Sequence, residues 1–145
     1  MKEKIVLKGR CVVEGCAEGE AIVTKHKISG YGAVDPKTGS FVDEREPDIY
    51  GRSFAGKILV FDGAKGASGW SLCYHDCRIN GVAPLAMLFN VTTTKVALGA
   101  VVARTPAVTD FENDISITDI IQDGDWVRVD ATNGVVEITK SDANN

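Results

Sequence analysis

The chain has 145 residues, a net charge of −4 and a hydrophobic fraction of 44%, values typical of one soluble globular domain with a real core. It has no basic tail or basic helix face, so nucleic acid is not expected as a partner. Its longest apolar runs are far shorter than the roughly 20 residues that cross a bilayer. Residues 1–4 lead into an alternating segment and not into a signal-peptide core. We therefore expect a cytoplasmic protein without membrane contact.

The N-terminal part of the chain predicts strands separated by glycine. Residues 5–14 are rich in Val, Ile and Leu and predict a strand that Gly15 ends, and residues 20–24 predict a second strand. Residues 25–52 form a long irregular stretch with many turn residues. A loop of this length is usually functional or disordered, and its apolar and aromatic residues favour order. Residues 57–61 predict a buried strand.

The C-terminal part mixes helix and strand signals. A helix is predicted from Trp70 to about Asn80, because Gly81 can end it. The dipeptide Asn133-Gly134 is the strongest short hairpin signal. The other expected elements are a buried strand at 84–89, an apolar strand at 97–103, a turn with a short extended piece at 105–108, a helical turn at 116–121, and hairpin strands at 125–130 and 135–139. This order predicts a mixed α/β, barrel-like domain over residues 1–140, with a flexible tail at 141–145.

The turn from Asp62 to Ser71, with the sequence DGAKGASGWS, is the most informative segment of the chain. It is not a P-loop, because Gly69 is followed by Trp70, and it lacks the dinucleotide fingerprint. Glycines allow positive φ and let a ligand approach the backbone. Unpaired N–H groups at a helix start favour a carboxylate or phosphate. A tight connection that needs glycine for geometry alone is the alternative.

The remaining chemistry-bearing residues form no recognisable catalytic or metal motif. The four cysteines lack Cys-x2-Cys spacing, so we expect buried or half-buried free thiols and no metal site. His26 and His75 are the only histidines, and neither lies in a triad-like pattern. The carboxylates of residues 43–48 are expected to form a solvated loop. Arg104, after the apolar run, is expected to reach water or to hold an anionic group.

Seven segments taken together resemble the small, swivelling subunit of the aconitase X family. They follow the family order from about Gly9 to Ile138. The resemblance implies a swivelling β/β/α barrel-like domain, as in the mobile fourth domain of aconitase. The segments are 13–23, 32–39, 51–61, the glycine turn 62–71, 83–86, 98–103 and 123–127.

The resemblance also implies a function and a partner. The chain would be the small subunit of an iron–sulfur hydro-lyase that dehydrates a small hydroxy acid, with phosphomevalonate and cis-3-hydroxyproline as the two substrate types. A large catalytic subunit would complete the heterodimer and hold the iron–sulfur cluster, so this chain would bind no metal and would be inactive alone. The small subunit would close over the site and supply a serine.

Ser68 is the residue to which the resemblance and the glycine turn assign catalysis. Substrate binding is assigned to Lys65, Gly66, Ala67, Gly69 and Ser71, and the loop from Tyr31 to Asp48 is expected to face the partner with the turn. The family turn usually reads Gly-Ser-Ser or Gly-Ser-Thr before a further Gly-Ser. Here Ala67 stands where the first serine often lies, and Trp70 stands where a small residue is common. The alternative is a non-catalytic binding or regulatory module with the same fold.

Overall fold

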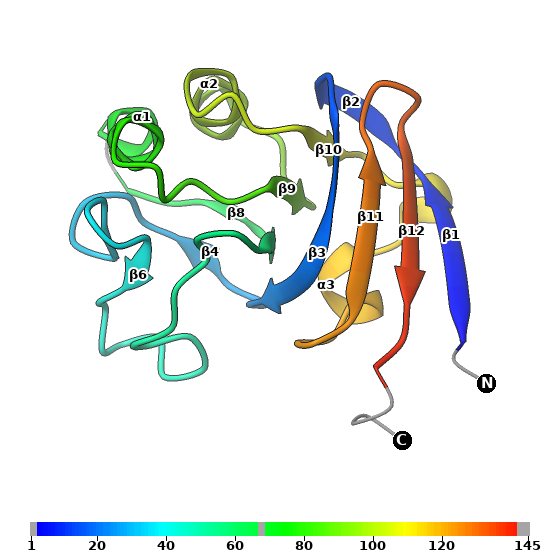
Figure 1. The fold of residues 1–145 in the computed structure, drawn as a ribbon, viewed down its shortest axis with the longest axis horizontal. Helices are drawn as coiled ribbons and strands as arrows, with labels where there is room; N and C mark the ends of the chain where they lie inside the picture. The colour runs from blue at the N-terminus through cyan, green and yellow to red at the C-terminus, as the bar shows by residue number, and fades with distance from the viewer. Residues whose placement is uncertain (1–2, 67–68, 142–145) are drawn as a thin grey trace.

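A computed structural model describes residues 3–66 and 69–141 and shows one large mixed sheet with helices against it (Figure 1). The eight strands of this sheet lie in the order β1-β12-β11-β3-β7-β9-β10-β2. The mixed α/β, barrel-like prediction is therefore confirmed. The strands are β1 (Lys4–Lys8), β2 (Arg10–Val13), β3 (Cys16–Val23), β7 (Ile58–Phe61), β9 (Ala86–Phe89), β10 (Ala107–Thr109), β11 (Trp126–Asp130) and β12 (Val135–Thr139).

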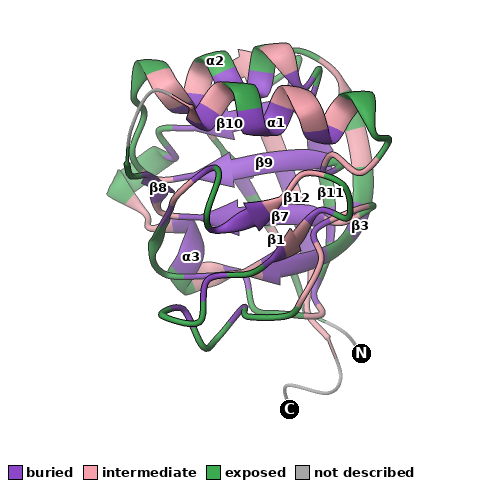
Figure 2. Ribbon diagram, turned by 90° about the vertical axis from the view of Figure 1, so that its left-hand side faces the viewer, coloured by how far each residue is buried: buried purple, intermediate pink, exposed green. Residues whose placement is uncertain are grey.

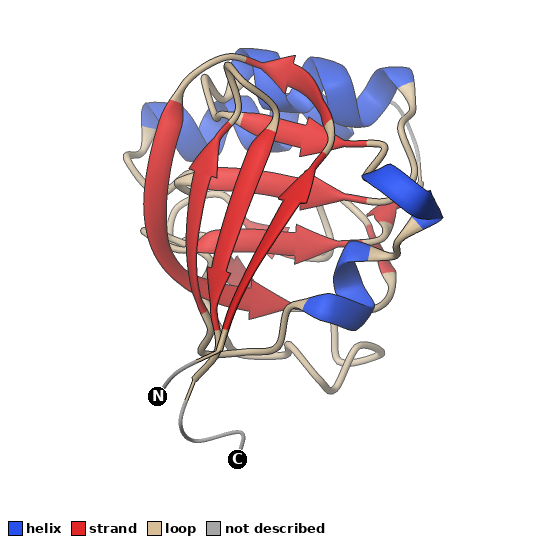
Figure 3. Cartoon of the chain, turned by 90° about the vertical axis from the view of Figure 1, so that its right-hand side faces the viewer, coloured by secondary structure: helices blue, strands red, loops and turns tan. Residues whose placement is uncertain are grey.

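The two ends of the sheet are consecutive in the chain, which curls the sheet toward a barrel. Strands β1 and β2 are separated by Gly9, whose amide donates to the Gly134 carbonyl at 2.8 Å. A Cβ at Gly9 would lie 2.7 Å from the Thr109 carbonyl oxygen, so a side chain has no room there. The single strand predicted at 5–14 is thus wrong, because the chain changes partners at Gly9. The antiparallel strands cross in front of the parallel ones in Figure 3.

The parallel half of the sheet carries the two main helices on one face. The end of β3 and strands β7, β9 and β10 run parallel. Helices α1 (Trp70–Ile79) and α2 (Thr94–Val102) connect them and cover the sheet (Figure 2). Along β7, Leu59 and Phe61 join the core with α1 and α2, whereas Ile58 and Val60 join the barrel core. Burial on both faces explains the continuous apolar runs of these strands.

Helix α2 corrects the apolar strand predicted at 97–103. The Thr93 side chain accepts a hydrogen bond from the Val96 amide and caps the helix. Val96, Gly99 and Ala100 form its buried face, and the outer positions Leu98 and Val101 are also apolar but exposed. Because apolar residues surround the helix, its period is hidden in the sequence. Arg104 therefore follows a helix and not a strand.

The other expectations mostly hold. Gly69 is the N-cap of α1, and β11 pairs with β12, with Val129 opposite Val136. The described part of the chain has no helix long and apolar enough to cross a membrane. The expected tail begins at Ser141, whose amide donates to Asp125, and residues 142–145 lie outside the described part. The smaller elements are β4 (Lys27–Ile28), β5 (Val34–Asp35), β6 (Ser40–Phe41), β8 (Gly63–Ala64), the 3₁₀ turn Glu112–Asp114 and α3 (Ile117–Ile120).

Candidate functional site

A polar residue directly follows each of the four parallel strands. These residues are Thr24 after β3, Asp62 after β7, Asn90 after β9 and Asp110 after β10. The carboxyl ends of neighbouring parallel strands meet at one edge of a sheet, which is where open α/β sheets bind ligands. We call this the carboxyl edge. Hollows open along it, among them one at the glycine turn and one beside Asn90.

The first hollow, of about 310 Å³, brings together three of the residues assigned to the site from the sequence. Lys65, Gly66 and Gly69 line it, and Gly66 has a φ of +94°, a conformation that favours glycine. Ser71 lies in the first turn of α1 and is half-buried. The rest of the lining is Ser29, Gly30, Tyr31 and Trp70. Ser68 and Ala67, to which catalysis and substrate binding were assigned from the sequence, lie outside the described residues.

Tyr31 forms one wall of this glycine-turn hollow. Its hydroxyl donates a hydrogen bond to Asp76 on α1, and this bond, aided by burial, raises the pKa of Tyr31 to about 12. A Cβ at Gly69 would lie 3.3 Å from the Tyr31 ring, and one at Gly30 would lie 2.9 Å from the Trp70 Cα. The loop therefore packs backbone against backbone on the start of α1. Tyr31 stays a neutral hydrogen-bond donor at physiological pH.

Three lysines surround the glycine turn, and two of them are neutralised by carboxylates. The Lys65 ammonium lies 3.0 Å from Glu46 Oε1, and the Lys27 ammonium lies 3.2 Å from Asp62 Oδ2. The third, Lys95 in the first turn of α2, donates to the Gly66 carbonyl. Backbone amides and ammonium groups together make this turn suited to an anionic ligand.

The acidic loop corrects the expectation of a solvated segment. Asp43 and Glu46 are buried, at 7% and 9% exposure. Hydrogen bonds from the Arg45 side chain and amide lower the pKa of Asp43 to about 2. Glu46 holds Lys65, as described above. Two of the carboxylates in this loop therefore stabilise the loop and the glycine turn instead of facing solvent.

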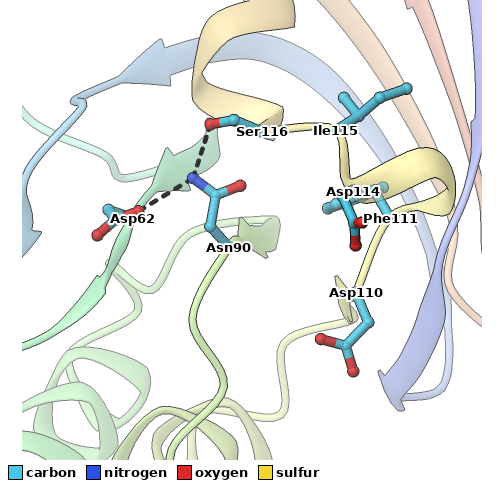
Figure 4. Close-up of a pocket in the computed structure, with 7 residues that line it drawn as sticks. All are labelled: Asp62, Asn90, Asp110, Phe111, Asp114, Ile115 and Ser116. Atoms are coloured by element: carbon cyan, nitrogen blue, oxygen red, sulfur yellow. Dashed lines mark hydrogen bonds between the residues drawn. The ribbon is translucent and has the colours of Figure 1, made fainter.

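The second hollow, of about 340 Å³, was not identified from the sequence (Figure 4). Asn90 is its centre: the side-chain amide donates to Asp62 Oδ1 and Ser116 Oγ, both at 3.1 Å, and its carbonyl accepts from the Ile117 amide at 2.8 Å. Asp110 and Asp114 line the opposite side, with φ values of +50° and +53°. The sequence signal that could have identified this hollow is the polar residue that follows each buried strand.

The residues of this chain do not fit an iron–sulfur cluster. Cys73 and Cys77 are buried one turn apart on α1, and their mutual hydrogen bond and burial raise the pKa of Cys73 far above its usual range. Cys11 on β2 is half-buried and Cys16 on β3 is exposed, so the expectation of no exposed thiol is wrong for Cys16. The metal-compatible groups found in the described residues include no cysteine.

The other candidate metal and catalytic groups already have protein partners. His26, Glu46 and Asp48 bring ligand atoms within 4.8 Å of one another. Glu46 holds Lys65, however, and Asp48 accepts from the Thr24 hydroxyl at 3.0 Å. The other histidine, His75, lies beside Asp76 and Arg78. These contacts give no support to a serine–histidine triad.

The fold and its carboxyl edge define a small domain that presents a glycine turn and polar strand ends to a ligand. A family model described as the aconitase X swivel domain matches residues 6–138. The chain belongs to this family.

Relatives and a solved structure match more than nine-tenths of the chain. The chain is 40% identical to the phosphomevalonate dehydratase small subunit of Methanosarcina acetivorans, over 94% of this chain and 92% of that protein. It is 44% identical to the protein of that name in Thermococcus kodakarensis, over 91% and 95%. The crystal structure of Thermococcus kodakaraensis aconitase X in its holo-form matches with a TM-score of 0.86 at 40% identity, over 94% of this chain and 99% of that one. The match therefore spans more than nine-tenths of each of these proteins.

Proposed function

We propose that this chain is the small subunit of a cytoplasmic, aconitase X-type phosphomevalonate dehydratase. The observation that carries the proposal is the match, over more than nine-tenths of both chains, to small subunits of that name at about 40% identity. The carboxyl edge supports it, because the glycine turn and its lysines suit a substrate that bears a phosphate and a carboxylate. In this proposal a large subunit holds the iron–sulfur cluster, and the small domain closes over its site.

Dehydration of a hydroxy acid requires a base for a carbon-bound proton and removal of the hydroxyl group. Ser68 is proposed as the base of this chain. A serine can serve as a base only when its alkoxide is stabilised by nearby N–H groups and cations. The backbone of the glycine turn and the ammonium of Lys65 are proposed to supply that stabilisation. Tyr31 and Gly69 line the hollow at the described part of the glycine turn.

Reconstitution with the large subunit tests this proposal. The chain is coexpressed with a large subunit of the aconitase X family, and the complex is purified under anaerobic conditions. Loss of water from phosphomevalonate is followed by mass spectrometry, with cis-3-hydroxyproline as the competing substrate. We expect turnover of phosphomevalonate by the complex and none by the small subunit alone. A complex that contains iron and dehydrates only cis-3-hydroxyproline would refute the substrate assignment.

Substitution of serine tests the catalytic role. Removal of a positioned general base typically lowers the rate by about 10²–10⁴-fold. Ser68→Ala should therefore lower kcat by that order while the two subunits still associate. Ser71→Ala is the matched control, because Ser71 lies in the first turn of α1. Loss of activity in Ser71→Ala alone would move the role to Ser71.

A non-catalytic binding or regulatory module is the second candidate, and the altered turn favours it. In the family turn that this segment resembles, a serine is common at the position of Ala67 and a small residue at the position of Trp70. The Trp70 side chain is buried in the core. In this case neither serine variant changes the rate of the assembled enzyme. A complex that forms without iron, or a chain that finds no large subunit, would also favour the module.

A further inference from the structure

Lys95 differs from the other two lysines at the glycine turn. It is the second residue of α2, it is half-buried, and its ammonium donates to the carbonyl of Gly66. Lys65 and Lys27 are matched by Glu46 and Asp62. Among residues 3–66 and 69–141, no carboxylate forms an ion pair with Lys95. Among the described residues, Lys95 is thus an ammonium next to the turn that no carboxylate of the protein neutralises.

The position of Lys95 is also electrostatically unfavourable for the free protein. The first turn of a helix favours anions and disfavours cations, because its N–H groups carry partial positive charge. The first turn of α2 has no acidic residue to offset this effect, and neither does that of α1. An anion bound at this position would remove the mismatch. A backbone carbonyl satisfies one hydrogen bond of an ammonium group, which leaves two N–H donors for a ligand.

We propose that Lys95 binds an oxyanion group of the substrate beside Gly66 and so contributes to substrate selection. This inference rests on the proposed function for the identity of the substrate. Lys65 is held against Glu46, so Lys95 supplies the net positive charge. A phosphate or a carboxylate has the required chemistry, and either fits next to the hollow of about 310 Å³ that Gly66 lines.

Kinetics of the assembled enzyme give the first test. A hydrogen bond to a charged group is typically worth a factor of about 10 to 100 in binding. Lys95→Gln should raise the KM for phosphomevalonate by about that factor with little change in kcat. Lys95→Arg keeps the charge and should keep the KM within a few-fold. Lys8→Gln is the matched control, because Lys8 lies at the end of β1 on an exposed site.

Mevalonate, which has the carboxylate but no phosphate, separates the two sources of the anion. If Lys95 binds the phosphate, Lys95→Gln should weaken inhibition by inorganic phosphate and leave inhibition by mevalonate unchanged. If it binds the carboxylate, the reverse should hold. Either result supports the proposal. Unchanged KM and unchanged inhibition by both compounds would overturn it.

A titration of the small subunit with inorganic phosphate tests Lys95 independently of the reaction. Amide NMR signals of Gly66 and Lys95 should shift with phosphate and not with sodium chloride of equal ionic strength, and Lys95→Gln should abolish the shift. If the complex fails to dehydrate phosphomevalonate but the shift is present, the proposed function fails and the anion site stands. If neither phosphate nor mevalonate shifts these signals in the parent chain, or if Lys95→Gln dissociates the subunits, Lys95 has a structural role and the inference is refuted.

Discussion

Gly99→Ala sets helix propensity against packing. A Cβ at Gly99 would lie 2.2 Å from Cζ3 and 2.6 Å from Cε3 of the Trp70 ring. That ring cannot move freely. Its indole N–H donates to the Ile28 carbonyl at 2.9 Å, and it stacks on Tyr74 with centroids 4.3 Å apart.

Two effects of opposite sign determine the result. Alanine in place of glycine within a helix stabilises by about 1 kcal/mol. An added methyl group in a packed core typically destabilises by about 1–3 kcal/mol, and a contact of 2.2 Å with a rigid ring belongs at the upper end. Gly99→Ala should therefore lower the free energy of unfolding by about 2 kcal/mol.

Urea denaturation of the chain measures this change. Ala97→Gly is the control for propensity and should destabilise by about 1 kcal/mol. In a Trp70→Phe background the smaller ring leaves space, so the effect of Gly99→Ala should shrink or reverse. A stabilised Gly99→Ala variant would show that the close packing of α2 on Trp70 is wrong.

Two further predictions concern polar groups that join distant segments. Asp125 is fully buried; burial opposes its ionisation, but hydrogen bonds from Lys140 and the amides of Gln122 and Ser141 prevail and lower its pKa. The stabilisation by ionised Asp125 should therefore be present above the ordinary aspartate pKa, about 4, and be lost as pH falls through the lower pKa of the folded state. Urea midpoints measured below pH 4 check this. Asp125→Ala should lower the free energy of unfolding by about 3–5 kcal/mol at pH 7. Asn90→Ala should lower the free energy of unfolding by about 2 kcal/mol and speed hydrogen exchange at the Ile117 amide. Exchange as slow as in the parent chain would show that Asn90 does not hold this amide.

Elements that are marked by a local sequence signal could be predicted from the sequence. The Asn133-Gly134 turn gave the β11–β12 hairpin, and the apolar run before Asp62 gave β7. The start of α1 followed from a strand and a glycine turn in succession, and its end followed from Gly81. Helix α2 could not be predicted in this way, because its identity depends on Gly99 fitting against Trp70, which is distant in sequence.

The same distinction between local and distant residues applies to the candidate site. The glycine turn was found because its residues are adjacent in the chain and because backbone chemistry requires glycine there. The partners of that turn come from elsewhere: Glu46 from the long loop, Lys95 from α2 and Tyr31 from the segment before β5. Each is ordinary in its own sequence context, and only the parallel order of β3, β7 and β9 brings them to one edge.

The charge balance at the carboxyl edge follows from this arrangement. Each lysine near the turn is supplied by a different segment: Lys27 by β4, Lys65 by the turn itself and Lys95 by α2. Glu46 fixes Lys65 and Asp62 fixes Lys27, which leaves the net charge of the turn dependent on Lys95. Since α2 places that residue only where Gly99 lets the helix approach Trp70, a substitution at Gly99 should alter anion binding as well as stability. Phosphate titration of Gly99→Ala at a temperature where the variant is folded should show weaker shifts at Gly66, and full binding would show that the turn keeps its charge without the close packing of α2.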